Sequence, residues 1–220
     1  MKSNSDGLMI DGIVGYIDRD NIDTDQIIPT EYLKSIKKFG FEDYLFDGWR
    51  YHDDGRLGIK KEEREINEDF ILNKTPFNES KILLARDNFG CGSSREHAVW
   101  ALRDFGFKAV IASSFGDIFY NNCFKNGILP IKLDEFEVTK LQKAAENSLS
   151  FTIDLENQKI SYFDKNINHE VSFELDKAKK TSLLEGLDDI GLTLAKVNHI
   201  SDFENKQKSR TPWLYSQQIK

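Results

Sequence analysis

Short apolar runs alternate with helical segments through the middle of the chain, and this alternation limits the choice of fold more than any other feature. The runs are about four to six residues long, as expected of buried strands. Between two of them, Ala98, Ala101, Leu102 and Phe105 fall on one side of an expected helix. The pattern therefore predicts a mixed α/β core. We expect strands at 13–17, 82–85, 109–112 and 128–133, and helices at 94–105, 117–125 and 135–146.

The chain after residue 150 follows a different pattern. Two apolar runs, at 151–155 and 160–163, flank a short polar stretch as the arms of a hairpin do. A third run at 171–175 predicts another strand, and 177–184 predicts a helix. These strands are expected to be antiparallel additions to the α/β core.

Two stretches lack the periodic apolar positions of a helix or strand. Residues 42–69 are rich in charged and aromatic side chains and predict long loops with a short helix, mobile in part. From Asp202 onward the chain is polar. We therefore expect one domain over residues 1–200 and a polar C-terminal tail over residues 201–220.

The charge balance argues against several classes of partner. The 220 residues carry a formal net charge of −7, whereas nucleic acids and anionic membranes select clustered positive charge. A single arginine can still bind an acidic substrate locally. No apolar run is long enough to span a bilayer, and the first residues lack the apolar core of a signal peptide. We expect a cytoplasmic protein that binds neither nucleic acid nor membrane.

The chain contains two cysteines, Cys91 and Cys123. Without an export signal a structural disulfide is not expected, and two thiols are too few for an iron–sulfur cluster. The four histidines show no zinc-like spacing with either cysteine. The sequence therefore predicts that this chain holds no metal or other cofactor of its own.

The stretch NFGCGSSREHA, residues 88–98, lies between an expected strand and an expected helix. Open α/β folds bind ligands at such a junction. The stretch departs from the dinucleotide fingerprint, the P-loop and the nucleophile elbow. What remains is a tight loop that carries two hydroxyls, Ser93 and Ser94, and the guanidinium of Arg95 to a helix start. A guanidinium fork matches a carboxylate, so carboxylate binding is one interpretation.

The same residues allow two other interpretations. Ser93 and Glu96 have the spacing of a capping box, which would make the loop a structural helix start. Cys91 could instead be a thiolate nucleophile whose pKa is lowered near the helix start. The residues alone leave all three open, and Cys123 is expected in the core.

Asp23 and Asp25 form a second candidate, in the stretch NIDTD. A solvated Asx turn before Pro29 is the favoured interpretation. A divalent-cation site is less favoured, because no further oxygen ligands are spaced nearby.

Four separated segments point to one family. The chain contains NIDTDQIIPTEYLK, ILLARDNFGCGSSREHAVWAL, SSFGDIFYNNCFKNGILPIKL and GLDDIGLTL. Together they resemble the small-subunit family of 3-isopropylmalate dehydratase, in its longer bacterial form, from about residue 12 to residue 194. The resemblance implies a swivelling β/β/α barrel-like domain similar to the C-terminal domain of aconitase.

The resemblance also implies a reaction and a partner. Members of this family isomerise 2-isopropylmalate to 3-isopropylmalate by dehydration and rehydration in leucine biosynthesis, together with a large subunit that holds a 4Fe–4S cluster. A related hydro-lyase that acts on citraconate/2-methylmalate or homoaconitate is the nearest alternative. A stand-alone Cys91 thiol enzyme is the alternative from another class.

Roles for individual residues follow from the same resemblance. The serine that corresponds to Ser93 acts as the general base in aconitase-like enzymes, and Asp25 corresponds to an active-site acid. Ser94 and Arg95 fall on substrate-binding positions. The loop after Pro29 is implied to select the substrate, with Leu33 and Ile36 as an apolar wall and Lys38 where close relatives commonly have arginine.

Overall fold

The structure is a computed structural model and describes residues 8–34, 38–186, 189–194 and 196–214. Its strands are β1 (Met9–Ile17), β2 (Ile82–Ala85), β3 (Ala109–Ala112), β4 (Leu129–Lys132), β5 (Ser150–Asp154), β6 (Lys159–Asp164) and β7 (Ile167–Ser172). Its α-helices are α1 (Thr24–Ile27), α2 (Asp47–Arg50), α3 (Glu96–Phe105), α4 (Asp117–Lys125), α5 (Glu135–Glu146), α6 (Lys177–Glu185), α7 (Asp189–Leu194) and α8 (Val197–Arg210).

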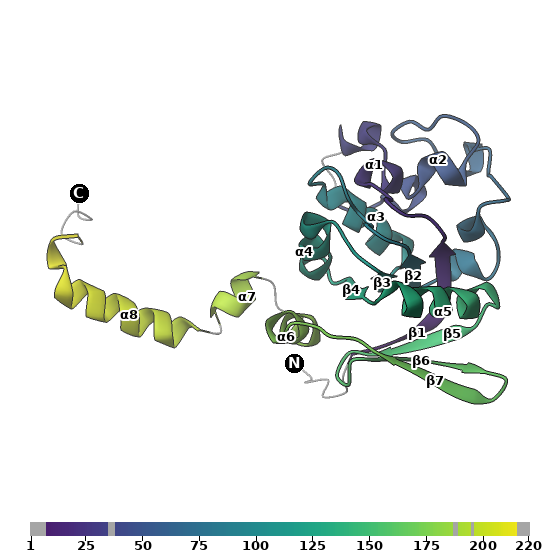
Figure 1. Ribbon diagram of the computed structural model, residues 1–220. Coiled ribbons are helices and arrows are strands. Elements are labelled where there is room, and N and C mark those ends of the chain that lie inside the picture. Colours follow the sequence, from purple (N-terminus) through teal and green to yellow (C-terminus); the bar gives the residue numbers. More distant parts are fainter. Residues whose placement is uncertain (1–7, 35–37, 187–188, 195, 215–220) are drawn as a thin grey trace.

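The strands form one curled sheet in the order β4-β3-β2-β1-β5-β6-β7 (Figure 1). The long strand β1 joins its two halves. Residues 14–17 pair parallel with β2, whereas residues 9–13 pair antiparallel with β5. The predicted mixed α/β core with antiparallel additions is therefore confirmed.

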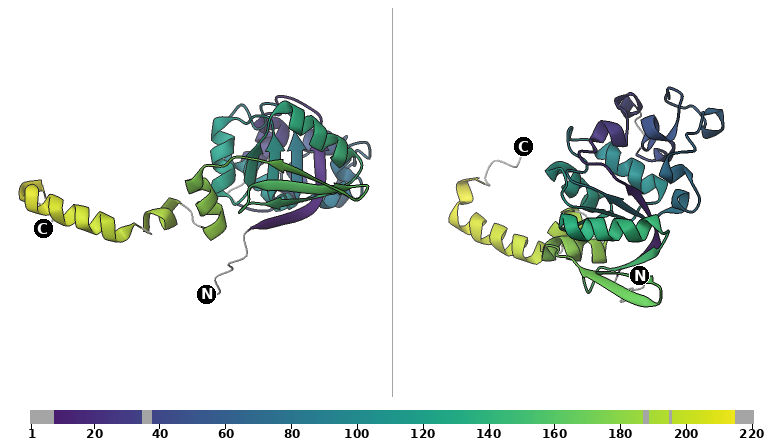
Figure 2. Two further views of the ribbon diagram at one scale, coloured as in Figure 1. Left: turned by 60° about the horizontal axis from the view of Figure 1, so that its bottom comes forward. Right: turned by 45° about the vertical axis from the view of Figure 1, so that its right-hand side comes forward.

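Alternate residues of the parallel strands face two separate hydrophobic cores. Leu83 of β2 and Val110 of β3 pack into the core that includes α3. Their neighbours Ile82 and Ile111 pack into the core that includes α5 and strands β5 and β6. Helices α3 and α5 therefore cover opposite faces of the sheet (Figure 2). Burial on both faces explains why these strands are continuous apolar runs in the sequence.

Most element bounds agree with the sequence patterns, but those of β1 and β7 do not. Strand β1 is predicted at 13–17 and begins at Met9, where its first residues pair with β5. Strand β7 differs at both ends. The apolar run predicts a strand at 171–175, and the strand runs from residue 167 to residue 172. The turn before it places Lys165 and Asn166 at positive φ, 48° and 67°. This two-residue turn contains no glycine, so the sequence does not signal how early the chain reverses.

The segment between α1 and β2 is tied together by buried polar contacts. It contains the buried side chains of Arg50 and Arg64. Its elements are α2 and the 3-10 turns η1 (Thr30–Lys34), η2 (Glu42–Tyr44), η3 (Lys61–Glu63), η4 (Ile71–Asn73) and η5 (Phe77–Glu79). Arg50 donates to the carbonyl of Glu42 at 2.8 Å and to Asn73 Oδ1 at 3.2 Å. The expectation of partly mobile loops over 42–69 missed this network.

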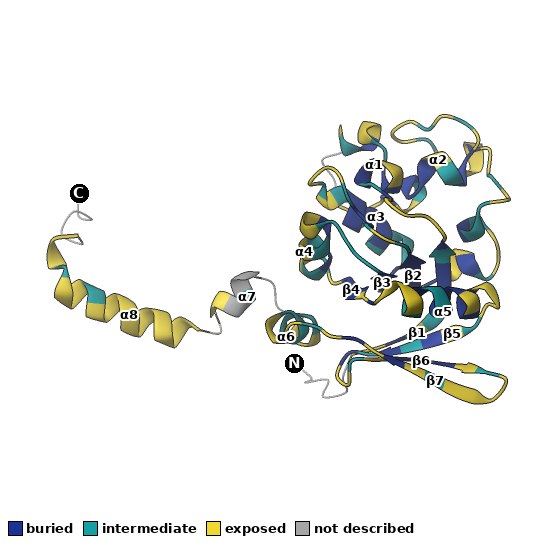
Figure 3. Cartoon of the chain, in the orientation of Figure 1, coloured by how far each residue is buried: buried dark blue, intermediate teal, exposed yellow. Residues whose placement is uncertain are grey.

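Helices α7 and α8 extend away from the sheet (Figure 1). Helix α8 crosses residue 200, where the sequence predicted the domain to end and a polar tail to begin. The described residues of this arm are largely exposed, including Ile200 and Phe203 (Figure 3). No helix in the described part of the chain is long and apolar enough to cross a bilayer.

Candidate active site

The loops that follow β1, β2 and β3 meet at the carboxyl ends of these parallel strands. The amide of Gly90 donates to the carbonyl of Ile22 at 2.7 Å, and the amide of Thr24 donates to the carbonyl of Cys91 at 3.0 Å. These bonds join the second loop to the first. Because open α/β sheets bind ligands at this edge, the meeting point is the candidate active site.

Two glycines allow the loops to approach this closely. Gly90 has a φ of 72°, and a Cβ there would lie 2.2 Å from Cγ of Phe119. Gly116, in the loop after β3, faces the same point, because its Cβ would lie 2.6 Å from the Gly90 carbonyl oxygen. Side chains at either position would push the loops apart.

Arg95, Asp25 and Thr30 form a polar cluster at this junction. Arg95 Nη1 pairs with Asp25 Oδ1 and donates to Thr30 Oγ1 at 3.0 Å. The Thr30 hydroxyl in turn donates to Asp25 Oδ1 at 2.7 Å. The structure therefore brings together Asp25 and Arg95, which were predicted from separate segments. Thr30 was missed, because a threonine after Pro29 has no signal of its own in the sequence.

The guanidinium of Arg95 remains accessible on one edge. Its side chain is 20 % exposed, and both of its hydrogen bonds to described residues use Nη1. The N–H groups of Nε and Nη2 can therefore donate two parallel hydrogen bonds to a carboxylate.

The predicted capping box between Ser93 and Glu96 is wrong. Helix α3 begins at Glu96, its N-cap is Arg95 in an extended conformation, and no side chain caps it. The Glu96 carboxylate instead accepts a hydrogen bond from Asn126 Nδ2 at 2.9 Å. Ser93 therefore lies two residues before the N-cap, and its hydroxyl is not needed to start the helix.

Both serines of the motif are exposed, and they directly precede Arg95 in the chain. The backbone of Ser93 is held in place, because its carbonyl accepts a hydrogen bond from Thr24 Oγ1 at 3.2 Å. The side chains of Ser93 and Ser94 stand at the surface, near a guanidinium and the start of a ten-residue helix. An anion or a developing negative charge would be stabilised there.

The two aspartates of the NIDTD stretch have different surroundings. Asp23 caps α1 through a capping box, in which its carboxylate accepts from the Gln26 amide at 2.8 Å and its own amide donates to Gln26 Oε1 at 3.0 Å. Asp25 points to Arg95 instead. Within the described residues, no group of three or more His, Cys, Asp or Glu side chains could hold a metal ion.

The thiol interpretation of Cys91 loses its premise. Cys91 lies five positions before the first residue of α3, not at the helix start. Burial, together with the negative charge of Asp23, raises the pKa of the Cys91 thiol, whereas a nucleophile needs it lowered. Cys123 is fully buried, as predicted, and burial raises its pKa well above the ordinary value.

The three predicted substrate-loop residues are placed differently. Leu33 is half-buried in η1 (Thr30–Lys34) and packs against the core that contains α3. Lys38 is exposed, and its carbonyl accepts a hydrogen bond from Arg103 Nη2 at 2.6 Å. Ile36 lies outside the described residues. Their contacts with substrate stay predictions.

Comparisons with known proteins identify the family of this chain. The aconitase C-terminal domain family matches residues 8–136, and the family of C-terminal domains from 3-isopropylmalate dehydratase small subunits matches residues 189–217. The 3-isopropylmalate dehydratase small subunit of Magnetococcus marinus is 51% identical over 208 residues, which cover 94% of this chain and 96% of the relative. This chain belongs to the 3-isopropylmalate dehydratase small-subunit family.

Other members of the 3-isopropylmalate dehydratase small-subunit family support the assignment. The relative from Hahella chejuensis is 50% identical over 94% of this chain and 95% of its own length. A solved structure titled 3-isopropylmalate dehydratase, from Methanocaldococcus jannaschii, superposes with a TM-score of 0.62 at 29% identity, covering 90% of this chain and 99% of that one. The resemblance and the aconitase-like fold predicted from the sequence are confirmed.

The second family match lies in the C-terminal part of the chain. The C-terminal family domain spans α7, α8 and the 3-10 turn η6 (Pro212–Leu214). The match therefore includes residues 201–217 of the predicted polar tail.

Proposed function

We propose that this chain is the small subunit of a hydro-lyase that interconverts 2-isopropylmalate and 3-isopropylmalate in leucine biosynthesis by removing and re-adding water. The observation that carries the proposal is the Arg95 guanidinium, held by Asp25 and Thr30 with one edge accessible, beside two exposed serine hydroxyls. The names of both relatives favour isopropylmalate over the methylmalate and homoaconitate alternatives.

Each residue of the cluster has a role in this proposal. Arg95 binds a substrate carboxylate, and Ser94 donates a hydrogen bond to it. Ser93, as an alkoxide, removes the proton from the carbon beside the carboxylate. Removal of that proton builds negative charge, which Arg95 and the N-terminus of α3 stabilise. Asp25 orients the guanidinium and is the proposed acid of the site.

A large subunit is the proposed partner. Asp25, Ser93 and Ser94 are exposed at one edge of the sheet, so a partner can cover them and complete a closed pocket. We place the 4Fe–4S cluster in that partner, since this chain has only two cysteines and Cys123 is buried in the core. A cluster iron supplies a Lewis acid that helps hydroxide leave. Both thiols are free, which fits the reducing cytoplasm as the proposed location.

Anaerobic reconstitution tests this function. We expect the purified chain to be colourless and inactive on 2-isopropylmalate, and its mixture with the large subunit to interconvert the two isopropylmalates. The large subunit alone serves as the control. Robust isomerase activity of this chain without partner or iron would overturn the division of roles, and a reconstituted complex that prefers 2-methylmalate would overturn the substrate.

A further inference from the structure

The substrate loop is tied to the core through one aromatic side chain, Tyr32 of η1. Tyr32 is fully buried, and its ring stacks on that of Tyr44 with centroids 4.0 Å apart and planes 10° apart. Two residues earlier on the same turn, Thr30 contacts Arg95 and Asp25. The next residue, Leu33, is expected to face the substrate. The position of Tyr32 therefore sets the position of both neighbours.

The phenolic oxygen of Tyr32 points to a buried charge cluster. A Cβ on Gly55 would lie 1.6 Å from this oxygen and 2.9 Å from both Asp47 Oδ2 and Arg64 Nη1. The phenol, the carboxylate and the guanidinium therefore converge on one glycine. Burial and the adjacent Asp47 carboxylate raise the pKa of Tyr32, so its hydroxyl stays protonated at neutral pH. A side-chain hydrogen bond to the Asp47 carboxylate contributes to this pKa rise, although its geometry falls outside that of a normal hydrogen bond.

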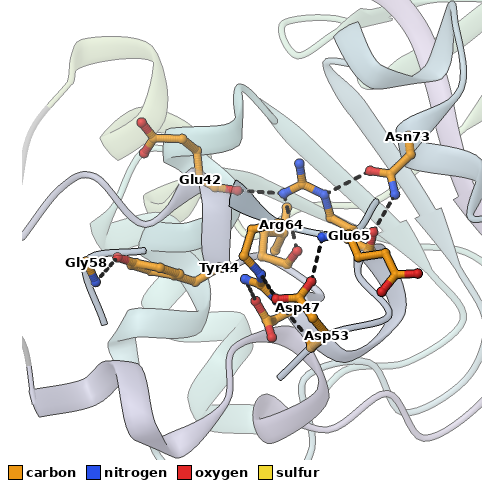
Figure 4. Close-up of polar contacts among 10 residues, drawn as sticks. Glu42, Tyr44, Asp47, Asp53, Gly58, Arg64, Glu65 and Asn73 are labelled. Carbon is orange, nitrogen blue, oxygen red and sulfur yellow. Dashed lines mark hydrogen bonds and ion pairs between the residues drawn. The ribbon is translucent and has the colours of Figure 1, made fainter. Parts of the chain in front are cut away.

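Several contacts hold Arg64 in the charge cluster. Arg64 Nη1 donates to Asp47 Oδ1 at 2.7 Å and Arg64 Nε to Asp53 Oδ2 at 2.8 Å (Figure 4). The Arg64 guanidinium also lies 3.9 Å from the ring centroid of Tyr51. The Arg64 side chain is only 2% exposed. Buried ion pairs are expensive to desolvate and contribute little net stability. A role in holding a segment in one place accounts for such a cluster better than stability does.

We propose that Asp47 and Arg64 form an anchor that positions the substrate loop through Tyr32. Tyr32 is a positioning residue, since it acts on the substrate through Thr30 and Leu33 and does not itself touch it. The anchor fixes where Thr30 meets Arg95 and where Leu33 faces the isopropyl group. This inference rests on the proposed function and adds a specificity device to it.

Tyr51 provides a matched control for Tyr32. Its hydroxyl is also buried without a hydrogen bond of normal geometry to the described residues, and its ring contacts the same guanidinium. Unlike Tyr32, it lies outside the substrate loop. Tyr32→Phe and Tyr51→Phe therefore each remove a buried hydroxyl from a ring beside Arg64, and only the first removes it from the substrate loop.

The kinetic test uses both variants in the full complex with the large subunit. For Tyr32→Phe we expect the KM for 2-isopropylmalate to rise about three- to tenfold, the effect of one lost hydrogen-bonding group, with kcat within about twofold. The preference for 2-isopropylmalate over 2-methylmalate should fall by a similar factor. Tyr51→Phe should leave both values unchanged. Equal KM and equal preference in the two variants would overturn the positioning role.

A pair of glycine substitutions tests the anchor without removing a polar group. In Gly55→Ala the new methyl group would overlap the Tyr32 hydroxyl and displace the ring. In Gly48→Ala, in the same segment, the methyl group would meet nothing within 4 Å. We expect Gly55→Ala to reproduce or exceed the KM rise of Tyr32→Phe, and Gly48→Ala to behave like the natural chain. An unchanged KM in a folded Gly55→Ala complex would count against the anchor.

Amide hydrogen exchange separates failure of the anchor from failure of the proposed function. In Tyr32→Phe the peptide that spans Thr30 to Lys34 should exchange at least threefold faster than in the natural chain, and in Tyr51→Phe it should not. This readout needs no substrate. If the unmodified complex does not isomerise 2-isopropylmalate, the proposed function fails and the exchange data still decide the anchor. Equal exchange in both variants would overturn the anchor whatever the activity.

Discussion

Arg95 pairs with Asp25 although the two residues are 70 positions apart in the chain. Asp25 lies in the loop after β1, and Arg95 is the last residue before α3, in the loop after β2. Parallel pairing of these strands brings both loops to one edge of the sheet. The pair orients the guanidinium through Nη1 and leaves its Nε and Nη2 edge for a ligand.

The first prediction concerns Arg95→Lys in the reconstituted complex. Lysine keeps the positive charge but loses the planar fork that binds a carboxylate at two points. One charge-assisted hydrogen bond contributes about 1.5–3 kcal/mol, so kcat/KM for 2-isopropylmalate should fall about ten- to a hundredfold. Steady-state kinetics and a melting curve measure the two effects separately.

Arg86→Lys is the matched control. Arg86 lies in the same loop but pairs with Asp18 at 2.5 Å and with Thr139 at 2.8 Å, away from the cluster. The complex with Arg86→Lys should retain most of the isomerase activity. If Arg95→Lys is as active as Arg86→Lys, then Arg95 is a structural residue and does not bind substrate.

The second prediction concerns the reactivity of Cys91. Because burial and the Asp23 carboxylate raise its pKa, the reactive thiolate is scarcer at neutral pH than in an ordinary cysteine, whose pKa is about 8.5. Alkylation by iodoacetamide should be slow at pH 7 and still be accelerating above pH 8.5. Mass spectrometry of the modified peptide gives the rate at each pH, with free cysteine as the reference.

Cys91→Ser should accordingly keep substantial isomerase activity in the complex. Since a serine cannot replace a thiolate nucleophile, loss of all turnover in a folded and assembled Cys91→Ser would restore the thiol interpretation. Rapid alkylation at pH 7 would point the same way.

Local sequence patterns predicted the buried elements well. Four elements have the predicted bounds, namely the strands at 82–85 and 109–112 and the helices at 117–125 and 135–146. Each of them is signalled by apolar positions within a few consecutive residues. The start of α3 was predicted at 94 and lies at 96. Arg95 adopts an extended conformation that lets it reach Asp25, so a long-range contact overrides the local capping signal.

Contacts between distant segments were beyond local patterns. Arg64 belongs to a charge-rich stretch that is typical of solvated loops, yet its side chain is buried between Asp47 and Asp53. Resemblance to a family pointed to Asp25 and Arg95 individually, but their pairing and the part of Thr30 appear only once the strands are placed side by side. Functional residues that act through such contacts can be identified only when the fold is known.

The third prediction tests how closely the loops must approach. Gly90→Ala adds a methyl group that would overlap the Phe119 ring and places alanine at a φ of 72°. Left-handed strain costs about 1–2 kcal/mol, and overpacking adds about 1–3 kcal/mol. Gly92→Ala is strained in the same way at a φ of 92°, but its nearest contact would be at 3.5 Å.

Chemical denaturation of the two variants separates strain from collision. The free energy of unfolding of Gly92→Ala should fall only by the cost of the left-handed strain. That of Gly90→Ala should fall by at least about 1 kcal/mol more, because of overpacking. Equal losses in the two variants would mean that the approach of the loops is not limited by the Phe119 ring.

The last prediction concerns Ser93, and the structure makes it simpler than the sequence allowed. Because Arg95 is the N-cap of α3 and Ser93 is exposed, neither Ser93→Ala nor Ser93→Gly removes a helix cap. The free energy of unfolding of both variants should lie within about 0.5 kcal/mol of that of the natural chain, as for surface substitutions, and both should assemble normally with the large subunit.

A general base contributes about 10²–10⁴ in rate, so kcat should fall by that factor in both Ser93 variants while KM changes little. Single-turnover measurements on complexes purified by gel filtration would show the loss directly. Near-normal turnover in either assembled variant would remove Ser93 from the proton transfer and leave Arg95 and Asp25 as the catalytic contribution of this chain.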